Sequence, residues 1–83
     1  MDFLFSRLVK AKDSVREFNF KKPLSVSMNL FHVNVNDDLG NRIVFRMQKE
    51  GANGWKIVER QLPAWIYEVA PELNEAIEEQ LHK

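Results

Sequence analysis

The first part of the chain, from Asp2 to Phe18, carries apolar residues at intervals of three and four positions. This spacing is typical of an amphipathic helix, because residues three and four apart lie on one helix face. Asp2 is suited to cap the N-terminus of such a helix, and Pro23 favours its end, since the residue before a proline avoids helical backbone angles. We therefore predict a helix over residues 2–18. Its apolar stripe consists of Leu4, Leu8, Ala11, Val15 and Phe18.

The next part, residues 24–35, alternates between apolar and polar positions as a β-strand does, but the alternation changes phase near Leu30 and Phe31. A straight strand cannot turn both sets of apolar residues to one side. The pattern predicts either a β-bulge at this point or a strand that buries different faces against different partners. Residues 36–41 then combine short polar side chains with Gly40, which predicts a turn.

Residues 42–50 and 55–62 alternate in the same manner and predict a β-hairpin. Neighbouring residues on paired strands share a face of the sheet. A three-residue loop over residues 52–54 sets Gly51 opposite Trp55 and brings the apolar residues of both strands onto one face. We therefore predict this loop length, with a glycine in the left-handed conformation. The shared apolar face consists of Ile43, Phe45, Met47, Trp55 and Ile57.

The last part of the chain returns to helical spacing after Pro63, which is suited to the first position of a helix. Pro71 interrupts this spacing, because a proline lacks an N–H donor and clashes with the preceding turn, so the helix is kinked or starts again there. The sequence thus predicts a single domain, residues 1–83, of the α+β class. Its elements are a helix, a three-stranded antiparallel meander and a proline-kinked C-terminal helix, with both helices packed on one sheet face.

Composition narrows the function classes. The 83 residues include 12 basic and 12 acidic side chains, and this balance argues against a dedicated polyanion binder. The chain has no cysteine, which excludes disulfides, thiolate nucleophiles and cysteine-ligated zinc. Charged residues interrupt the N-terminal segment, and no apolar run is long enough to span a membrane. We therefore expect a soluble, cytoplasmic protein with no membrane association, although removal of a signal peptide stays open.

No catalytic motif is recognisable. The serines lack a nucleophile elbow, and there is no glycine-rich phosphate loop. His32 and His82 lie on different predicted elements, and the acidic pair Asp37 and Asp38 lacks the spacing of a calcium loop. The sequence predicts no catalytic residue, no cofactor and no metal site, and it favours a protein that is not an enzyme.

The predicted hairpin carries a second, basic face opposite its apolar one. An acidic protein partner, a second subunit or plain solvent could cover this face. Nucleic acid is the weaker choice, because sheets that bind RNA also offer aromatic side chains for stacking, and here the face offers Val44 and Val58. RNA binding on this face is therefore the third hypothesis for the function, after the interaction module and the ligand pocket that are described next. The basic residues are Arg42, Arg46, Lys56 and Arg60.

Charge and aromatic content favour an interaction module that self-associates, most simply as a homodimer. Residues 1–22 hold six basic and three acidic side chains, whereas residues 61–83 hold one and five, so the two ends of the chain are complementary within one subunit or across a two-fold axis. Six Phe, two Trp and one Tyr exceed what so thin a core needs, and aromatic residues are enriched at interfaces. The interface candidates are Trp65, Ile66, Tyr67, Phe31 and Phe5.

An alternative is a small domain with a pocket for an apolar ligand, lined by Trp55, Glu59 and His32. If Glu59 lies on the face of Trp55, burial would raise the pKa of its carboxyl group. The stretch 54–59 resembles the strand that closes cone-shaped sheets of the NTF2-like superfamily, where a tryptophan begins a late strand. This chain is shorter and continues into a proline-kinked helix, so that superfamily's pocket and catalytic residues are not carried over.

Overall fold

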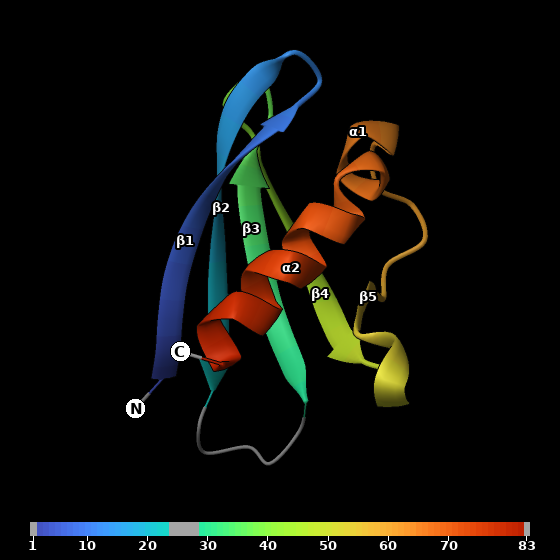
Figure 1. The fold of residues 1–83 in the computed structure, drawn as a ribbon. Coiled ribbons are helices and arrows are strands. Elements are labelled where there is room, and N and C mark those ends of the chain that lie inside the picture. The colour runs from blue at the N-terminus through green and yellow to red at the C-terminus, as the bar shows by residue number, and fades with distance from the viewer. Residues whose placement is uncertain (1, 24–28, 83) are drawn as a thin grey trace.

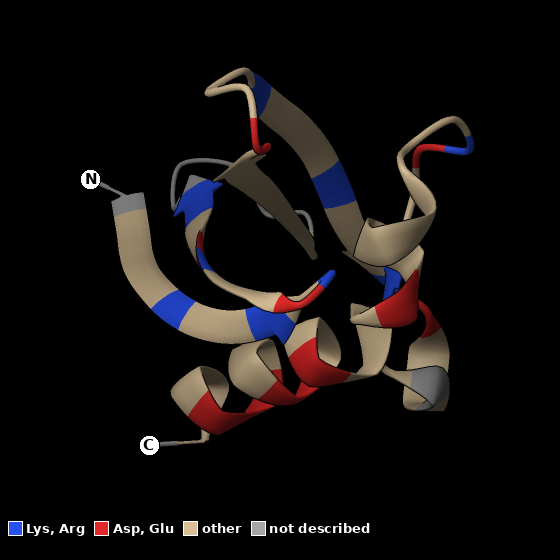
Figure 2. Ribbon diagram, turned by 90° about the horizontal axis from the view of Figure 1, so that it is seen from above, with Lys and Arg blue, Asp and Glu red and all other residues tan. Residues whose placement is uncertain are grey.

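The computed structural model describes residues 2–23 and 29–82, which form an antiparallel sheet and two helices (Figure 1). The five strands follow one another in the sheet in sequence order, and a short 3-10 turn, Gly51–Asn53, precedes the last strand. The sheet curls into a half-barrel, and α2 lies across its concave side (Figures 1 and 2). The elements are β1 (Asp2–Ala11), β2 (Ser14–Pro23), β3 (Leu30–Asn36), β4 (Arg42–Lys49), β5 (Trp55–Ile57), α1 (Ala64–Glu68) and α2 (Ala70–Leu81).

The α+β class is thus correct, but the predicted order of helix, three strands and helix is wrong. Where a helix was predicted over residues 2–18, the chain forms β1 and the first half of β2, joined by a tight turn in which Ala11 pairs with Ser14. The two turn residues, Lys12 and Asp13, have φ values of 53° and 62°. Positive φ at both central residues is the geometry of the type I′ turn, one of the two turns that favour two-residue hairpins.

The error has a physical reason. Residues four apart share a face in a strand as well as in a helix, so the spacing of Leu4 and Leu8 fits both structures. The odd-numbered residues of β1 face the concave core, and Val9 and Ala11 are buried there. The predicted buried stripe therefore lies partly outside: Leu4, Leu8 and Val15 are 64%, 65% and 65% exposed on the convex side.

Strand β3 carries the second of the two alternating sets, and Phe31, Val33 and Val35 are all buried. Most of the first set falls on residues 24–28, which lie outside the described residues. The bulge predicted near Leu30 and Phe31 is absent from the described pairing, because these residues lie opposite Gln48 and Met47 in an unbroken register with β4. The predicted turn after β3 is confirmed. Asp37 Oδ1 accepts hydrogen bonds from the backbone N–H groups of Leu39, at 2.9 Å, and Asn41, at 2.8 Å, and Gly40 has a φ of 83°.

The β4–β5 hairpin has the predicted apolar face but not the predicted loop. Trp55 pairs with Lys49 instead of Gly51, so five residues, 50–54, connect the strands in place of three. A register shift of two residues preserves the side to which each residue points, which is why the apolar face survives. Strand β5 ends at Ile57, whereas the sequence predicted a strand to residue 62.

The C-terminal helix is divided, as the proline pattern indicated. Val69 separates α1 from α2 with backbone angles of −100° and 7°, and Pro71 lies in the first turn of α2, where its missing donor costs no hydrogen bond. Leu73, Ala76 and Ile77 of α2 are fully buried against the concave face of the sheet. The two helices thereby span the half-barrel between β5 and β1.

Candidate functional site

The residues proposed to line a pocket are not brought together. Trp55 is buried on the concave side, where its ring lies 5.1 Å from that of Phe31. His32 lies on the other side of the sheet, at the position opposite Arg46. Glu59 follows β5 and binds Arg46, so it also belongs to the convex side.

Glu59 lies just after the short strand β5 and binds β4 through its side chain. The backbone N–H of Arg46 donates to Glu59 Oε1 at 2.7 Å, and the Arg46 guanidinium donates to Oε2 at 2.8 Å. The Tyr67 hydroxyl donates to the carbonyl oxygen of Glu59 at 2.6 Å, which ties α1 to this segment. Burial alone would raise the pKa of Glu59, but the hydrogen bonds and charge of Arg46 lower the pKa below its ordinary value. A lowered pKa suits a structural carboxylate, not a general base.

Most of the interface candidates lie inside a single chain. Phe31 and Ile66 are fully buried, and Trp65 is 9% exposed. Phe5 is half-buried and stacks on Phe20 with 4.4 Å between ring centroids. Tyr67 is the most exposed of the five, and its hydroxyl is occupied by the hydrogen bonds that hold the segment after β5.

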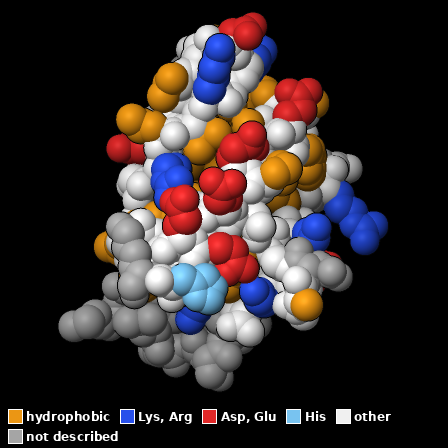
Figure 3. Space-filling view, in the orientation of Figure 1, with side chains coloured by type: hydrophobic (Ala, Val, Ile, Leu, Met, Phe, Trp, Pro, Cys, Tyr) orange, Lys and Arg blue, Asp and Glu red, His pale blue; other side chains and the backbone are white. Residues whose placement is uncertain are grey.

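Three residues of the predicted basic face lie on the convex side, spread along β4 and β5. Arg42, Arg46 and Lys56 are exposed there, and Arg60 is exposed beyond β5. In contrast, α2 is acidic, so the two charges occupy different layers of the molecule (Figure 2). Acidic side chains gather over α2 in the space-filling view (Figure 3).

The complementary charges of the two chain ends meet within one molecule. The guanidinium of Arg7 on β1 pairs with Glu79 of α2, and Lys49 of β4 pairs with Glu78 at 3.1 Å. Lys49 holds the pKa of Glu78 below its ordinary value. These pairs attach the helix to both sides of the half-barrel.

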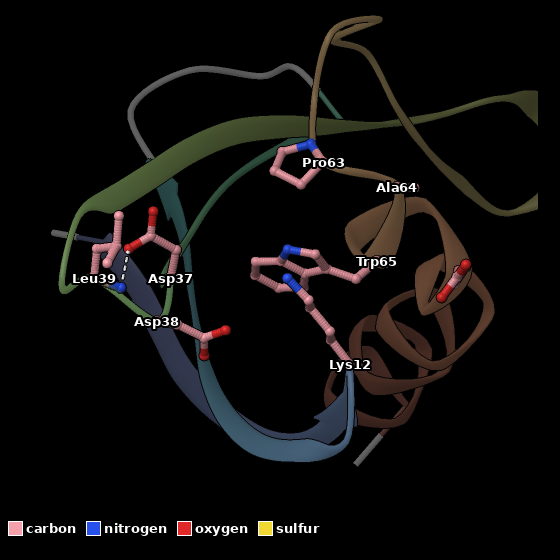
Figure 4. Close-up of a pocket in the computed structure, with 8 residues that line it drawn as sticks. Lys12, Asp37, Asp38, Leu39, Pro63, Ala64 and Trp65 are labelled. Carbon is pink, nitrogen blue, oxygen red and sulfur yellow. Dashed lines mark hydrogen bonds between the residues drawn. The ribbon is translucent and has the colours of Figure 1, made fainter.

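The surface also has an open recess beside Trp65 (Figure 4). Lys12 and Asp38 line it from two different turns, and Pro63 lines it from the start of α1. The Arg16 guanidinium lies 4.5 Å from the centre of the Trp65 ring, and Arg16 Nε donates to the carbonyl oxygen of Ala11 at 2.9 Å. Arg16 also forms an ion pair with Asp38 at 2.9 Å. These contacts hold the β1–β2 turn against α1, which is a structural role.

The surface that the sequence did not reveal is the outer edge of β1, which we call the β1 edge and define as residues 4–10. Strand β1 has β2 on one side, and no other described strand pairs with it (Figure 1). Because a two-residue turn makes Ala11 and Ser14 a hydrogen-bonded pair, bonding alternates from there along the hairpin. The even-numbered residues of β1 therefore direct their backbone N–H and C=O groups to the free side. In the β1 edge these are Leu4, Ser6, Leu8 and Lys10.

A row of polar side chains runs from the β1 edge across the convex face. The Ser6 hydroxyl donates to Asn19 Oδ1 at 2.6 Å, and Asn19 Nδ2 donates to Asn34 Oδ1 at 3.1 Å. Leu4 and Leu8 flank Ser6 on the same face. The free edge thus presents a small, fixed polar side chain between two exposed leucines.

Comparisons with protein-family models, with curated proteins and with solved structures found no significant match. In the described part of the chain, no helix is both long enough and apolar enough to cross a membrane. Residues 2–23 and 29–82 also hold no group of three or more side chains suited to bind a metal ion.

Proposed function

We propose that this protein is a non-enzymatic interaction module that self-associates as a homodimer through the β1 edge. The observation that supports the proposal best is an unpaired edge on a ten-residue strand with two leucines, Leu4 and Leu8, more than half exposed. An edge strand offers a row of unsatisfied backbone groups that readily pair with another strand.

Proteins that remain monomeric usually protect such an edge with prolines, bulges, outward charges or a very short strand. The pairing of β1 with β2 is continuous from Asp2 to Ala11, without a bulge, and residues 4–10 contain no proline. Arg7 is paired with Glu79, which leaves Lys10 as the protective charge of the β1 edge. The opposite edge differs, because β5 pairs with Met47–Lys49 of β4 and Glu59 binds the backbone N–H of Arg46. Among the described residues, the part of β4 that lacks a strand partner on this side is residues 42–45, which is shorter than the β1 edge.

Light scattering on size-exclusion fractions tests the proposal. We expect the native chain to be a dimer and Leu8→Lys to shift it to the monomer, because a charge at a pairing edge opposes strand addition. Within its own chain residue 8 lies opposite Glu17, so the lysine is compatible with the monomer fold. The matched control is Val44→Lys, which replaces a 57% exposed residue on the convex side of β4, near the opposite edge of the sheet and outside the proposed interface.

Two results would contradict the proposal. One is a native chain that is monomeric throughout the accessible concentration range. The other is a dimer that Leu8→Lys leaves intact while Val44→Lys dissociates it, which would transfer the interface to the basic part of the convex face.

A further inference from the structure

The residue order along the β1 edge defines how two copies would pair. This inference rests on the proposed function and specifies its partner. We infer that the second copy pairs antiparallel to the first, with a two-fold axis at Ser6. Each copy then places Leu4 opposite Leu8 of the other, and the two half-barrels join into one continuous ten-stranded sheet.

Backbone geometry restricts the possible registers. Two antiparallel strands bond through residues whose N–H and C=O groups point toward each other, and on the free side of β1 these are the even-numbered residues. Two-fold symmetry requires one residue to lie opposite its own counterpart. The central choices for that residue are Phe5, Ser6 and Arg7.

The three registers differ in the pairs that they create. An axis at Arg7 sets two guanidinium groups opposite each other and places Leu4 opposite Lys10. An axis at Phe5 places Leu4 opposite Ser6 and leaves Leu8 without an apolar counterpart in the β1 edge. Only the axis at Ser6 covers each exposed leucine with the other, and such cross-strand apolar pairs stabilise a sheet.

Charge and size favour the same register. On the concave side it sets Arg7 opposite Phe5 of the second copy and so separates the two arginines. Ser6 is small, and its hydroxyl is directed along its own strand pair to Asn19, so it leaves room for the leucines at the axis.

A second copy of the chain fits the β1 edge better than an unrelated strand does. An unrelated strand would use the backbone groups equally well, but the symmetric order of leucine, serine and leucine about residue 6 is matched by the chain itself. The test must therefore report register as well as association.

The chain has no cysteine, so a single engineered cysteine can form a disulfide only with its counterpart. Residues directly opposite on antiparallel strands have α-carbons about 5.5 Å apart, within the range that a disulfide needs. We expect Ser6→Cys to become a covalent dimer under mild oxidation. Leu4→Cys and Leu8→Cys should each stay unlinked, because residue 4 and its own counterpart lie about 13 Å apart along the strands in this register. A mixture of these two variants should give the linked heterodimer.

The mixture keeps the test independent of any effect that Ser6→Cys has on folding. Two results overturn the register: equal linkage of all three single variants, or an unlinked Ser6→Cys together with an unlinked mixture. If the disulfide test contradicts the register but light scattering still reports a dimer, the proposed function remains supported and only the register is wrong. If the native chain is a monomer, both fall together.

Discussion

At the scale of single residues, the contact between Arg46 and Glu59 stabilises the edge of the sheet next to the short strand β5. The Glu59 carboxylate takes the place of a β-strand beside Arg46, where the pairing of β4 with β5 ends, because it accepts the backbone N–H of Arg46 at 2.7 Å. A backbone donor that loses such a partner costs free energy. The contact therefore satisfies the backbone of β4 at Arg46, beyond the three residues that pair with β5.

The lowered pKa of Glu59 leads to a prediction about pH. A carboxyl group whose pKa is lower in the folded state stabilises the fold above its unfolded pKa, near 4.3, and this stabilisation disappears as the pH falls through the folded pKa. We expect Glu59→Gln to lower the free energy of unfolding by roughly 1 kcal/mol at pH 7. The difference between native chain and variant should shrink as the pH falls from about 5 to about 3. Urea denaturation across this pH range measures it, and a difference that grows on acidification would contradict the assignment.

At the scale of secondary-structure elements, the β1–β2 hairpin decides the architecture. The sequence predicted a helix there because the turn residues, Lys12 and Asp13, are not the asparagine and glycine that mark most turns of this type. Nothing in the local pattern separates Leu4 and Leu8 of a strand from the same pair on a helix. The element was settled by tertiary packing, since Phe18 and Phe20 complete the concave core.

A double substitution distinguishes the hairpin from the helix by the sign of its effect. Lys12→Asn combined with Asp13→Gly supplies residues that favour positive φ, so we expect it to stabilise the protein by about 1 kcal/mol. In a helix the same glycine would destabilise by about 1 kcal/mol. Chemical denaturation gives the sign directly, and Asp13→Ala serves as the control that should not stabilise, because alanine disfavours positive φ.

The later elements were more predictable because their signals are stronger. Asp37 and Gly40 carry recognisable turn chemistry, and Pro63 and Pro71 mark helix starts. The predicted hairpin loop is two residues too short, because the alternation of apolar and polar residues determines which face a residue occupies but does not fix the loop length. Glu50 N–H instead bonds to the carbonyl oxygen of Gly54 at 2.9 Å, across a short 3-10 turn.

At the scale of the whole molecule, the charges and aromatic rings that suggested a partner are largely used inside one chain. Arg7 and Glu79 join the two chain ends, and Phe31 and Trp55 meet in the core. The candidate site could not be found from the sequence, because an edge strand cannot be located before the strands are. Among the features that the fold leaves without a partner in the described residues, the β1 edge combines open backbone groups with two exposed leucines.

Amide hydrogen exchange, followed residue by residue at high and low protein concentration, tests the central claim most directly. If the β1 edge pairs with a second copy, the amides of Leu4, Ser6 and Leu8 are protected at high concentration and exchange faster on dilution. The amides of Phe5, Arg7 and Val9, which bond to β2, should be protected at both concentrations. Rapid exchange of the three even-numbered amides at every concentration, with their odd-numbered neighbours protected, would contradict self-association through this edge.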